Sequence, residues 1–439
     1  RVVVMVVAQA QMQLGSEAIW LGYLDKRRKR YVVIQPHPEM DLERPEHLRA
    51  VLGVRVRTKA LPGMQRYEKR KIRRALRALF FDVAAGLSFK APFRKANSSV
   101  EEWRALRSSK NFKSACVRPP ISIETVAAPG DQVLLLDNVQ KQDALTSYLE
   151  AMARRGLKIS VLIHDMIPVV TPQFAQGQTP DRVYAWLKRS TGFVTRYIAN
   201  SQHTAKDLKR FLDRNQAMQQ IKVVPLAQSR LPGAPPLRTV SEVDAALYPE
   251  FAAGLMVSDR IRGLGKMDFV LAVGTREIRK NLWSLARAWD LLRHEAGVSL
   301  PKLVIAGRAG WLNDDFDALM RGTGHLGGWV EIVDGPSDVE LDWLYRHCLF
   351  TAMVSYYEGW GLPIGESLGY GKTAVVSEAA SMPEVGGDMV EYCNPHDVTS
   401  ILRACRKLIN DDRHRKELED RIRTAKLRSW NAVATDLIE

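Results

Sequence analysis

The feature of this chain that most constrains its fold is an alternation of short apolar runs with helical stretches. The runs are rich in Val, Ile and Leu, as is typical of parallel strands that are covered on both faces. We predict strands at residues 133–136, 159–163, 197–199, 222–224, 269–273, 303–306, 330–333, 350–353 and 373–376. We predict helices at residues 142–155, 201–212, 282–294, 339–347 and 398–409. This order of elements predicts an α/β fold with parallel sheets.

The predicted elements fall into two groups, which indicates two domains. The first group of strands ends near residue 224 and the second begins at residue 269, with a Gly- and Pro-rich candidate linker at residues 228–266. Ligands of doubly wound domains bind beyond the carboxyl ends of the strands. We therefore predict two Rossmann-like, doubly wound domains that face each other across a cleft, at residues 1–228 and 229–424. A C-terminal helix at about residues 425–439 is expected to pack back on the first domain.

Composition narrows the class of protein. The 439 residues are 46% apolar and 26% charged, which is ordinary for a globular protein with large cores. The four cysteines form no Cys-x-x-Cys pair and have no His at ligand spacing, so we expect free thiols in a reducing compartment and no zinc site. No segment reads as a transmembrane helix or a signal peptide, and we expect a cytoplasmic protein.

The N-terminal residues are ambiguous. The stretch from Val2 to Val7 fits a strand by its β-branched residues, whereas the continuation to Leu14, followed by Gly15, fits a helix with a glycine stop. The chain starts on Arg1, and we expect an upstream strand and glycine-rich loop to be absent from it.

The net charge of +15 favours anionic partners. The stretch from Arg66 to Lys95 carries ten Lys or Arg residues against two acidic ones. Apolar residues that share one helical face within it are Ile72, Leu76, Leu79 and Phe80. This pattern fits an interfacial amphipathic helix on an anionic membrane surface. It fits equally a surface helix whose apolar side packs on its own domain.

A loop with two carboxylates follows the predicted strand at residues 350–353. It reads Glu358-Gly-Trp-Gly-Leu-Pro-Ile-Gly-Glu366 and opens a helical stretch. A glycine-rich loop at the start of a helix offers free backbone N–H groups and the positive end of the helix dipole to an anion such as a diphosphate. Carboxylates suit sugar hydroxyls. The alternative is a loop whose acidic residues only cap a helix.

A basic loop follows the predicted strand at residues 269–273. It reads Gly274-Thr-Arg-Glu-Ile-Arg-Lys-Asn281. Gly274 allows close backbone approach, and Arg279 and Lys280 supply fixed cations for phosphate. An isolated Arg-Lys pair often lies on a solvated surface, but the preceding strand directs this one to the sheet edge that carries the Glu358 loop.

A third candidate lies in the first half of the chain. The strand at residues 159–163 ends in His164 and Asp165, at the rim of the sheet. A His at such a rim can hydrogen-bond a sugar hydroxyl or orient an acceptor. A lone His is more often structural, so this assignment depends on the resemblance described next.

The second half of the chain resembles the nucleotide-binding domain of family 4 retaining glycosyltransferases, which have the GT-B fold. The resemblance covers about residues 269–409 and rests on five linked motifs. They are Gly-Thr-x-Glu-x-Arg-Lys-Asn from Gly274, Ala306-Gly-Arg-Ala-Gly-Trp311, Ser337-Asp-x-Glu-Leu341, the Glu358 to Glu366 loop, and Val376-Ser-Glu-x-x-Ser-Met-Pro-Glu-Val385. In the first half, His164-Asp-x-x-Pro168 and Ala199-Asn-Ser-x-x-Thr204 are similar to the family's acceptor domain. The first 130 residues match only loosely.

The resemblance implies roles for individual residues. Arg279 and Lys280 would hold the donor diphosphate, Glu358 would contact the donor sugar, and Glu366 would contact the ribose. Backbone groups at residues 334–337 would read the base. The expected catalytic residues are His164, Asp165, Arg279, Lys280 and Glu358. The expected donor-binding residues are Gly274, Thr275, Arg308, Gly335, Ser337, Gly359, Trp360, Gly361, Leu362 and Glu366. Ile278 and Thr275 stand where family members often have Pro and Arg, so Arg276 or Arg308 would compensate.

The resemblance also implies an activity. We expect a retaining hexosyltransferase that uses a GDP-mannose or UDP-hexose type donor and a glycan or lipid-linked acceptor in surface polysaccharide synthesis. No residue of the motifs is an obvious nucleophile, so the leaving diphosphate would deprotonate the acceptor on the same face. Because the family needs no Asp-x-Asp motif, we expect no metal ion and no cofactor. The protein is expected to be cytoplasmic, with peripheral attachment to the inner membrane.

Three other classes compete with this interpretation. A basic nucleic-acid- or membrane-binding protein with a non-catalytic nucleotide-binding domain fits the charge, but no nucleic-acid-binding module is recognisable, and we expect no nucleic acid partner. A nucleotide-dependent epimerase or dehydrogenase needs Gly-x-Gly-x-x-Gly after its first strand, which is missing. A degenerate transferase that only binds is disfavoured because both glutamates and His164 are retained.

Overall fold

A computed structural model describes most of the chain. The described residues are 2–15, 18–25, 30–36, 71–87, 89, 91–95, 103, 121–137, 143–230, 257–295 and 299–439. The chain divides into two compact units. The first comprises residues 1–6, 127–234 and 263–439, and the second comprises residues 7–126 and 235–262. Most of the predicted linker, residues 231–256, lies outside the described residues.

The first unit contains a four-stranded parallel sheet in the order β4-β5-β6-β7. Its strands are β4 (Gln132–Leu135), β5 (Lys158–Ile163), β6 (Arg196–Ala199) and β7 (Gln220–Val223). The connecting helices are α6 (Asp143–Arg154), α7 (Ile167–Val170), α8 (Thr179–Ser190) and α9 (Gln202–Arg214), with a 3-10 turn η3 (Pro172–Phe174). Every strand predicted here lies within two residues of an observed one, because strands covered on both faces are continuously apolar.

The same unit contains a six-stranded sheet in the order β10-β9-β8-β11-β12-β13. All its neighbours pair in parallel. The strands are β8 (Phe269–Val273), β9 (Lys302–Ala306), β10 (Val330–Val333), β11 (Thr351–Met353), β12 (Ala374–Ser377) and β13 (Glu391–Cys393). In chain order the strands run 3-2-1-4-5-6, which is the doubly wound arrangement. The order reverses between β8 and β11, so a crevice for a ligand is expected beyond these two strand ends.

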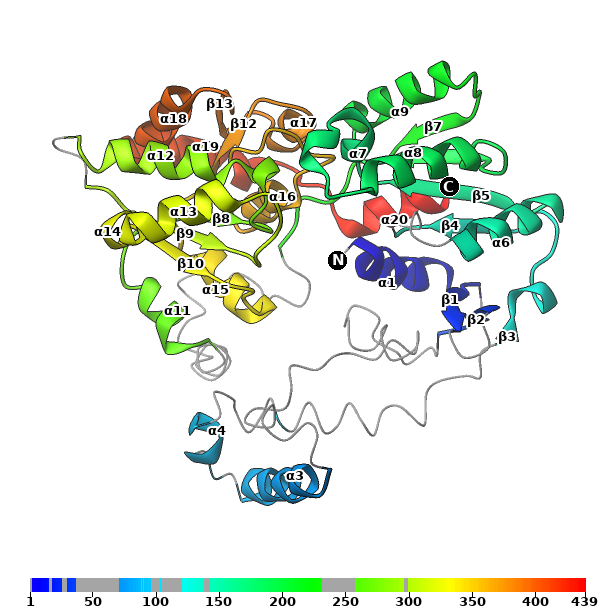
Figure 1. Ribbon diagram of the computed structural model, residues 1–439, viewed down its shortest axis with the longest axis horizontal. Coiled ribbons are helices and arrows are strands. Elements are labelled where there is room, and N and C mark those ends of the chain that lie inside the picture. The colour runs from blue at the N-terminus through cyan, green and yellow to red at the C-terminus, as the bar shows by residue number, and fades with distance from the viewer. Residues whose placement is uncertain are drawn as a thin grey trace. The chain divides into compact units, whose positions relative to one another are not determined.

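Helices cover both faces of the six-stranded sheet (Figure 1). They are α12 (Leu282–Leu292), α13 (Asp314–Gly322), α14 (Gly324–Gly328), α15 (Asp338–His347), α16 (Leu362–Gly369), α17 (Met382–Gly386), α18 (Val398–Asn410) and α19 (Asp412–Thr424). A short helix α11 (Asp259–Leu264) precedes β8 in the chain, and a 3-10 turn η5 (Ile278–Lys280) follows it. One apolar core joins β8 and β9 to α12, α13 and α18. A second joins β11 and β12 to α16 and α17. Burial on both faces is what allows the strands to be read from the sequence.

The residues that follow β7, up to residue 230, lie in close contact with α16. A Cβ atom on Gly369 would lie 2.4 Å from the backbone nitrogen of Arg230 and 2.5 Å from the carbonyl carbon of Ser229. Only glycine permits this approach. Gln228 donates from its backbone nitrogen to the oxygen of Arg428 at 2.9 Å and from Nε2 to the oxygen of Val385 at 2.8 Å. We call residues 225–230 the connector.

The C-terminal helix α20 (Trp430–Ile438) lies in the same unit. Its residues Trp430, Val433 and Leu437 share an apolar core with Leu162 of β5 and Ile198 of β6. Arg428 donates from Nε to the oxygen of Pro225 at 2.8 Å, at the start of the connector.

The second unit holds most of the N-terminal elements. They are β1 (Leu21–Asp25), β2 (Arg30–Ile34), β3 (Ile121–Ser122), α3 (Lys71–Gly86), α4 (Ala91–Lys95) and the 3-10 turn η2 (Ile123–Thr125). The three strands pair antiparallel in the order β1-β2-β3. Helix α1 (Val2–Leu14) precedes them, so the strand expected from Val2 to Val7 is wrong. The good helix formers that follow extend the helix to Gly15, which has φ +79° and donates to the oxygen of Gln11.

Helix α3 has one packed side and one exposed side. Phe81, Ala84 and Ala85 are buried against Phe93 and Trp103. The large apolar residues on the exposed side are Leu76, Leu79, Phe80 and Val83, all between 55% and 62% exposed, and Leu87 follows them at 76%. Their spacing of three and four places them in one stripe. Arg66, Lys69, Arg70 and Lys90 lie outside the described residues, as do the side chains of Lys71, Arg73, Arg74, Arg94 and Lys95.

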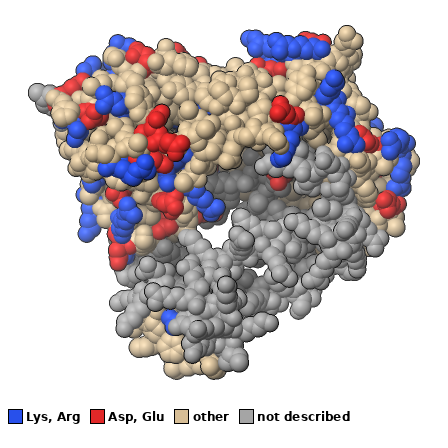
Figure 2. All heavy atoms as spheres, viewed as in Figure 1, with Lys and Arg blue, Asp and Glu red and all other residues tan. Residues whose placement is uncertain are grey.

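Charge over the described surface is mixed. In Figure 2, Lys and Arg side chains are interspersed with Asp and Glu over the described part of the visible face. None of the described helices combines the length and the apolarity needed to span a bilayer. The three described cysteines, Cys348, Cys393 and Cys405, are buried free thiols, as predicted for them.

Candidate active site

The loops that follow β8 and β11 meet at the point where the strand order reverses. The backbone nitrogen of Tyr356 donates to the oxygen of Arg279 at 2.9 Å and so joins the two loops. Asn281, in the left-handed conformation at φ +56°, donates from Nδ2 to the oxygen of Val354 at 3.1 Å and to that of Pro395 at 2.7 Å. The two predicted loops are therefore neighbours, held by backbone contacts at the carboxyl edge of the sheet.

Glu358 lies between the two predicted phosphate cations. Its Oε2 is 2.6 Å from Nη1 of Arg279, and its Oε1 is 2.7 Å from Nζ of Lys280. The side chains of the three residues are only 10–13% exposed. Residues that are far apart in the sequence, and that were assigned to different parts of a donor, thus form one buried cluster.

Burial and charge act in opposite directions on this cluster. Burial disfavours the ionised form of Glu358, but Arg279 and Lys280 outweigh it and lower its pKa to about 2. Glu277 also contacts Arg279, with 2.5 Å between Oε1 and Nη2, and burial raises the pKa of Glu277. Both cations are therefore neutralised by carboxylates, and an incoming anion has to share or displace Glu358.

A small cavity lies beside the cluster. Its lining includes Gly274, Thr275, Lys280 and Ser355. A Cβ atom on Gly274, which has φ +147°, would lie 3.2 Å from Cε of Lys280, so glycine leaves room for the lysine. The hydroxyl of Ser355 is fully buried and has no hydrogen-bond partner in the structure. This hydroxyl was not predicted, and it is a polar group available to a ligand or a water.

His164 and Asp165 lie at the carboxyl end of β5 and reach the Glu358 loop. The ring nitrogen Nε2 of His164 donates to the oxygen of Leu136 at 2.8 Å, which leaves Nδ1 to face other partners. The position of a Cβ atom on Gly359 would be 1.8 Å from the backbone oxygen of His164 and 2.7 Å from Cβ of Asp165. The predicted acceptor and donor residues are therefore brought together.

Contacts from α9 hold this junction, and most of them were not predicted. Asn200 donates from Nδ2 to the oxygen of His164 at 2.7 Å, and Thr204 donates to the oxygen of Gly359 at 3.2 Å. The carboxylate of Glu384 accepts from the backbone nitrogens of Gln202 and His203 at 2.7 and 2.9 Å. Glu384 thus caps a helix of the other sheet. The motifs containing Asn200, Thr204 and Glu384 were visible in the sequence, but their mutual contact was not.

Ser381 holds the backbone of the Glu358 loop through its hydroxyl. Its hydroxyl lies 2.8 Å from the oxygen of Glu358 and 3.1 Å from that of Trp360. The indole of Trp360 is buried in the apolar core, so this predicted donor-binding residue would offer its backbone. Gly361 has φ +110° and precedes α16, whose first residue, Leu362, is half-buried against the same core.

The predicted base-reading segment follows β10. Arg276 donates from Nη1 to the oxygen of Gly307 at 2.5 Å and lies 3.1 Å from Oδ1 of Asp334. The guanidinium of Arg276 therefore links the loop after β8 to the residues after β9 and β10. Arg308 and Thr275, in contrast, are exposed. Gly335 has φ +56°. Ser337 forms a capping box with Glu340 at the start of α15, so its hydroxyl is engaged in helix capping.

Glu366 is buried on α16. Its Oε2 accepts a hydrogen bond from the hydroxyl of Tyr345 at 2.7 Å. Tyr345 was not singled out in the sequence, because an aromatic residue on an amphipathic helix is usually just core. Among the described residues, no group of three or more His, Cys, Asp or Glu side chains is arranged to hold a metal ion.

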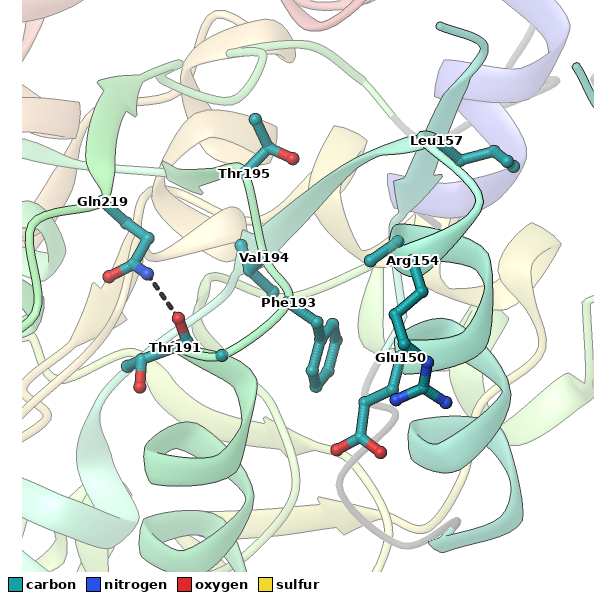
Figure 3. A pocket seen from close by; sticks show the side chains of 10 residues that line it. Glu150, Arg154, Leu157, Thr191, Phe193, Val194, Thr195 and Gln219 are labelled. Carbon is teal, nitrogen blue, oxygen red and sulfur yellow. Dashed lines mark hydrogen bonds between the residues drawn. The ribbon is translucent and has the colours of Figure 1, made fainter. Parts of the chain in front are cut away.

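A larger cavity, of about 660 Å³, lies elsewhere in the first unit. Its lining includes Leu157, Thr195 and Gln219, each of which precedes a strand of the four-stranded sheet (Figure 3). Gln219 donates from Nε2 to the oxygen of Thr191 at 2.5 Å. This cavity is therefore at the amino edge of the sheet, opposite the edge that carries His164, and does not belong to the candidate site.

Replacing Asp165 with Asn is expected to stabilise the folded protein near pH 8. Burial raises the pKa of Asp165 above its ordinary value of 3.8, with the charge of Arg279 opposing it. The folded state therefore holds the proton more tightly than the unfolded chain, and ionised Asp165 costs stability above the raised pKa. In the wild type, the backbone nitrogen of Ile167 donates to Oδ1 of Asp165 at 3.0 Å. The side-chain oxygen of Asn can accept the same hydrogen bond.

Urea unfolding from pH 3 to pH 8 measures this effect. The difference between the variant and the wild type should vanish below the ordinary pKa, where both states are protonated. Asp268→Asn, at an exposed position, is the control. A variant that is less stable than the wild type at pH 8 would contradict the expectation.

Comparison with known proteins gives a family match for the part of the chain that carries Arg279, Lys280 and Glu358. Residues 259–425 match the family model described as glycosyl transferases group 1. An O-antigen chain mannosyltransferase B of Escherichia coli is 35% identical over 172 residues, which are 39% of this chain and 44% of that protein. A serotype-specific mannosyltransferase WbdA of Escherichia coli is 25% identical over 272 residues, 60% of this chain and 30% of that protein. The chain thus spans less than half the length of either relative.

Solved structures agree in fold. HepE of Anabaena in complex with UDP-glucose has a TM-score of 0.53 at 16% identity, over 70% of this chain and 77% of that one. An α,α-trehalose-phosphate synthase (UDP-forming) of Burkholderia vietnamiensis has a TM-score of 0.51 at 12% identity, over 74% and 77%. The predicted GT-B fold with two Rossmann-like domains is confirmed. Residues 259–425 are therefore similar to the glycosyl transferases group 1 family, within a chain that has the GT-B fold.

Proposed function

We propose that the protein transfers mannose from GDP-mannose, with retention of configuration, to a glycan or lipid-linked acceptor in surface polysaccharide synthesis. The observation that carries the proposal is the cluster of Glu358, Arg279 and Lys280 at the reversal of the strand order. The names of the related mannosyltransferases support the sugar. The donor-binding part lies within residues 229–424 and the acceptor-binding part within residues 1–228.

The cluster suits a leaving diphosphate. Arg279 and Lys280 would stabilise the charge that develops on the diphosphate as the bond to the anomeric carbon breaks. The hydroxyl of Ser355 offers a further donor at the same place. Glu358, released from one or both cations, would then accept hydrogen bonds from the sugar hydroxyls.

Retention of configuration follows from the choice of nucleophile. Glu358 contacts the two cations that would hold the leaving diphosphate, so it lies on the leaving-group side and not on the opposite face, from which a double-displacement nucleophile has to attack. The acceptor hydroxyl therefore attacks on the face that the diphosphate leaves. Its oxygen bonds to the anomeric carbon, the carbon–phosphate-oxygen bond breaks, and the hydroxyl proton passes to the departing phosphate oxygen. The residues contribute charge and position, with no metal ion required.

Guanine suits the base-reading segment at residues 334–337 better than uracil does. Asp334 is 70% exposed, and Arg276 fixes one of its carboxylate oxygens. Guanine offers two adjacent N–H donors to a carboxylate, whereas uracil offers one, flanked by carbonyls that a carboxylate repels. This difference supports GDP-mannose over a UDP-hexose.

A thermal-shift panel of GDP, UDP, GDP-mannose and UDP-glucose, followed by assay of donor turnover with and without EDTA, tests the proposal. GDP-mannose should give the largest shift, and turnover should survive EDTA. Lys280→Ala is the matched control, because it removes a phosphate cation but leaves Glu358 paired with Arg279. A preference for UDP-glucose would exclude the mannosyl donor, and a shift that is unchanged in Lys280→Ala would exclude the diphosphate site.

We further propose that α3 attaches the protein peripherally to the inner face of an anionic membrane. The packed side of the helix is formed by Phe81, Ala84 and Ala85, which leaves the stripe from Leu76 to Leu87 without cover. Ten Lys or Arg residues lie between Arg66 and Lys95. An apolar stripe within a basic segment is the pattern of helices that lie in the surface of anionic bilayers.

The double replacement of Leu79 and Phe80 with Glu is expected to abolish flotation with liposomes that contain anionic lipid. Each change places a negative charge in the apolar stripe, where it opposes both insertion and the lipid charge. Met218→Glu, at a residue that is 93% exposed in the loop between α9 and β7, should still float. Equal recovery of the wild type with neutral and anionic liposomes would disprove the attachment.

A further inference from the structure

The side chain of Tyr345 ends on the carboxylate of Glu366. Its hydroxyl donates to Oε2 at 2.7 Å, and both residues are buried, with exposures of 0% and 5%. A hydrogen bond from a neutral donor to a buried carboxylate is strong, and it fixes the plane of the carboxylate. The direction in which Glu366 presents its oxygens therefore depends on Tyr345.

Tyr345 is itself held rigidly between two helices. It lies on α15, and its ring stacks on Tyr370 at the end of α16, with 5.0 Å between centroids and 6° between planes. The hydroxyl of Tyr370 donates to Oδ1 of Asp342 at 2.6 Å, and Oδ2 of Asp342 lies 2.7 Å from Nε of Arg346. The ring of Tyr370 therefore restricts the orientation of Tyr345 by stacking, whereas the hydroxyl of Tyr370 contacts Asp342.

Helix α15 connects two parts of the donor site. Its N-cap, Ser337, is the last residue of the base-reading segment, and the capping box with Glu340 fixes the start of the helix. Two turns later it supplies Tyr345 to Glu366. A nucleoside bound with its base at the start of α15 would have its ribose directed toward the carboxylate that the same helix orients.

We infer that Tyr345 is a positioning residue that lets Glu366 select a ribose with free hydroxyls. The inference rests on the proposed function, because it needs a nucleotide at this edge. The carboxylate accepts hydrogen bonds from the 2′- and 3′-hydroxyls only when its oxygens face the sugar. A site built to bond hydroxyls discriminates strongly against a ligand that lacks them. Without the Tyr345 hydroxyl, Glu366 would lose part of this discrimination.

The test compares GDP with 2′,3′-dideoxy-GDP in binding to the wild type, Tyr345→Phe and Tyr370→Phe. The wild type should bind GDP more tightly than the dideoxy nucleotide. Tyr345→Phe should reduce that preference about five- to tenfold, because it weakens the binding of GDP. Tyr370→Phe is the matched control, because it removes a hydroxyl of the same network that bonds Asp342 and not Glu366. Its preference should stay at the wild-type ratio.

The ratio of the affinities for GDP and 2′,3′-dideoxy-GDP distinguishes a positioning role of Tyr345 from a purely structural one. A loss of packing or stability in Tyr345→Phe lowers the affinity for both nucleotides and leaves their ratio unchanged, which would overturn the inference. Equal reductions in both tyrosine variants, or a wild type that does not discriminate, would overturn it as well. If the wild type binds neither nucleotide, the proposed function fails and the inference fails with it.

Discussion

Glu358→Gln is expected to lower sugar transfer by about 10²–10³-fold while GDP binds more tightly than to the wild type. The carboxylate now bonds both Arg279 and Lys280 in a site that is almost closed to solvent. A neutral amide of the same shape cannot neutralise both cations, so more positive charge remains for the diphosphate. The same amide accepts more weakly from sugar hydroxyls, and transfer falls.

The opposite signs of the two effects make the experiment decisive. Turnover and the Kd of GDP are measured on the same preparation, with thermal unfolding as a check on folding. Glu417→Gln, at an exposed acidic residue of α19 outside the five motifs, is the control and should change neither quantity. Weaker GDP binding in Glu358→Gln would show that Glu358 does not compete with the phosphate. Near-normal turnover would remove Glu358 from the site.

Gly359→Ala is expected to lower turnover by about 10²-fold while GDP binding changes little. A Cβ atom at this position would lie 1.8 Å from the backbone oxygen of His164, well inside van der Waals contact. The strand behind His164 is buried, so the loops have to separate. Separation moves His164 and Asp165 away from Glu358, and a misplacement of about 1 Å is enough for a loss of this size.

The control for this change is Gly322→Ala, where the new Cβ atom would meet nothing within 4 Å. It should leave both turnover and GDP binding unchanged. If Gly359→Ala impairs GDP binding as strongly as turnover, the change has disturbed the donor loop and not the junction with His164. Wild-type turnover would mean that the junction opens without consequence.

Much of the fold could be predicted because strands that are buried on both faces have almost continuously apolar sequences. Strands β8 and β10 have the predicted bounds, since their apolar residues, such as Val270, Ala272 and Val330, are buried in one core. Strand β13 was missed because it has only three residues, of which Cys393 alone is fully buried. Helix α1 was ambiguous because its first half is β-branched and its second half is not.

The site was predictable as motifs but not as contacts. The sequence placed Arg279, Lys280 and Glu358 at one sheet edge, because parallel strands end together. It did not show that Glu358 occupies both cations, because pairing depends on loop geometry and burial. Tyr345 was missed for the same reason, because it acts on a residue more than twenty positions away. Ser381 was visible as part of a motif, but its contacts with backbone oxygens of the Glu358 loop were not.

The close fit of the connector against α16 bears on how such proteins can be recombined. Residues 225–230 follow a strand of the four-stranded sheet, yet their contacts through Gly369, Val385 and Arg428 are made with the later part of the chain. A hybrid that joins this acceptor half to a relative's donor half should therefore have its crossover before Pro225. If the crossover were placed after the connector, one parent would supply the connector and the other would supply α16. Their surfaces would then not match at Gly369, where there is no room even for a methyl group.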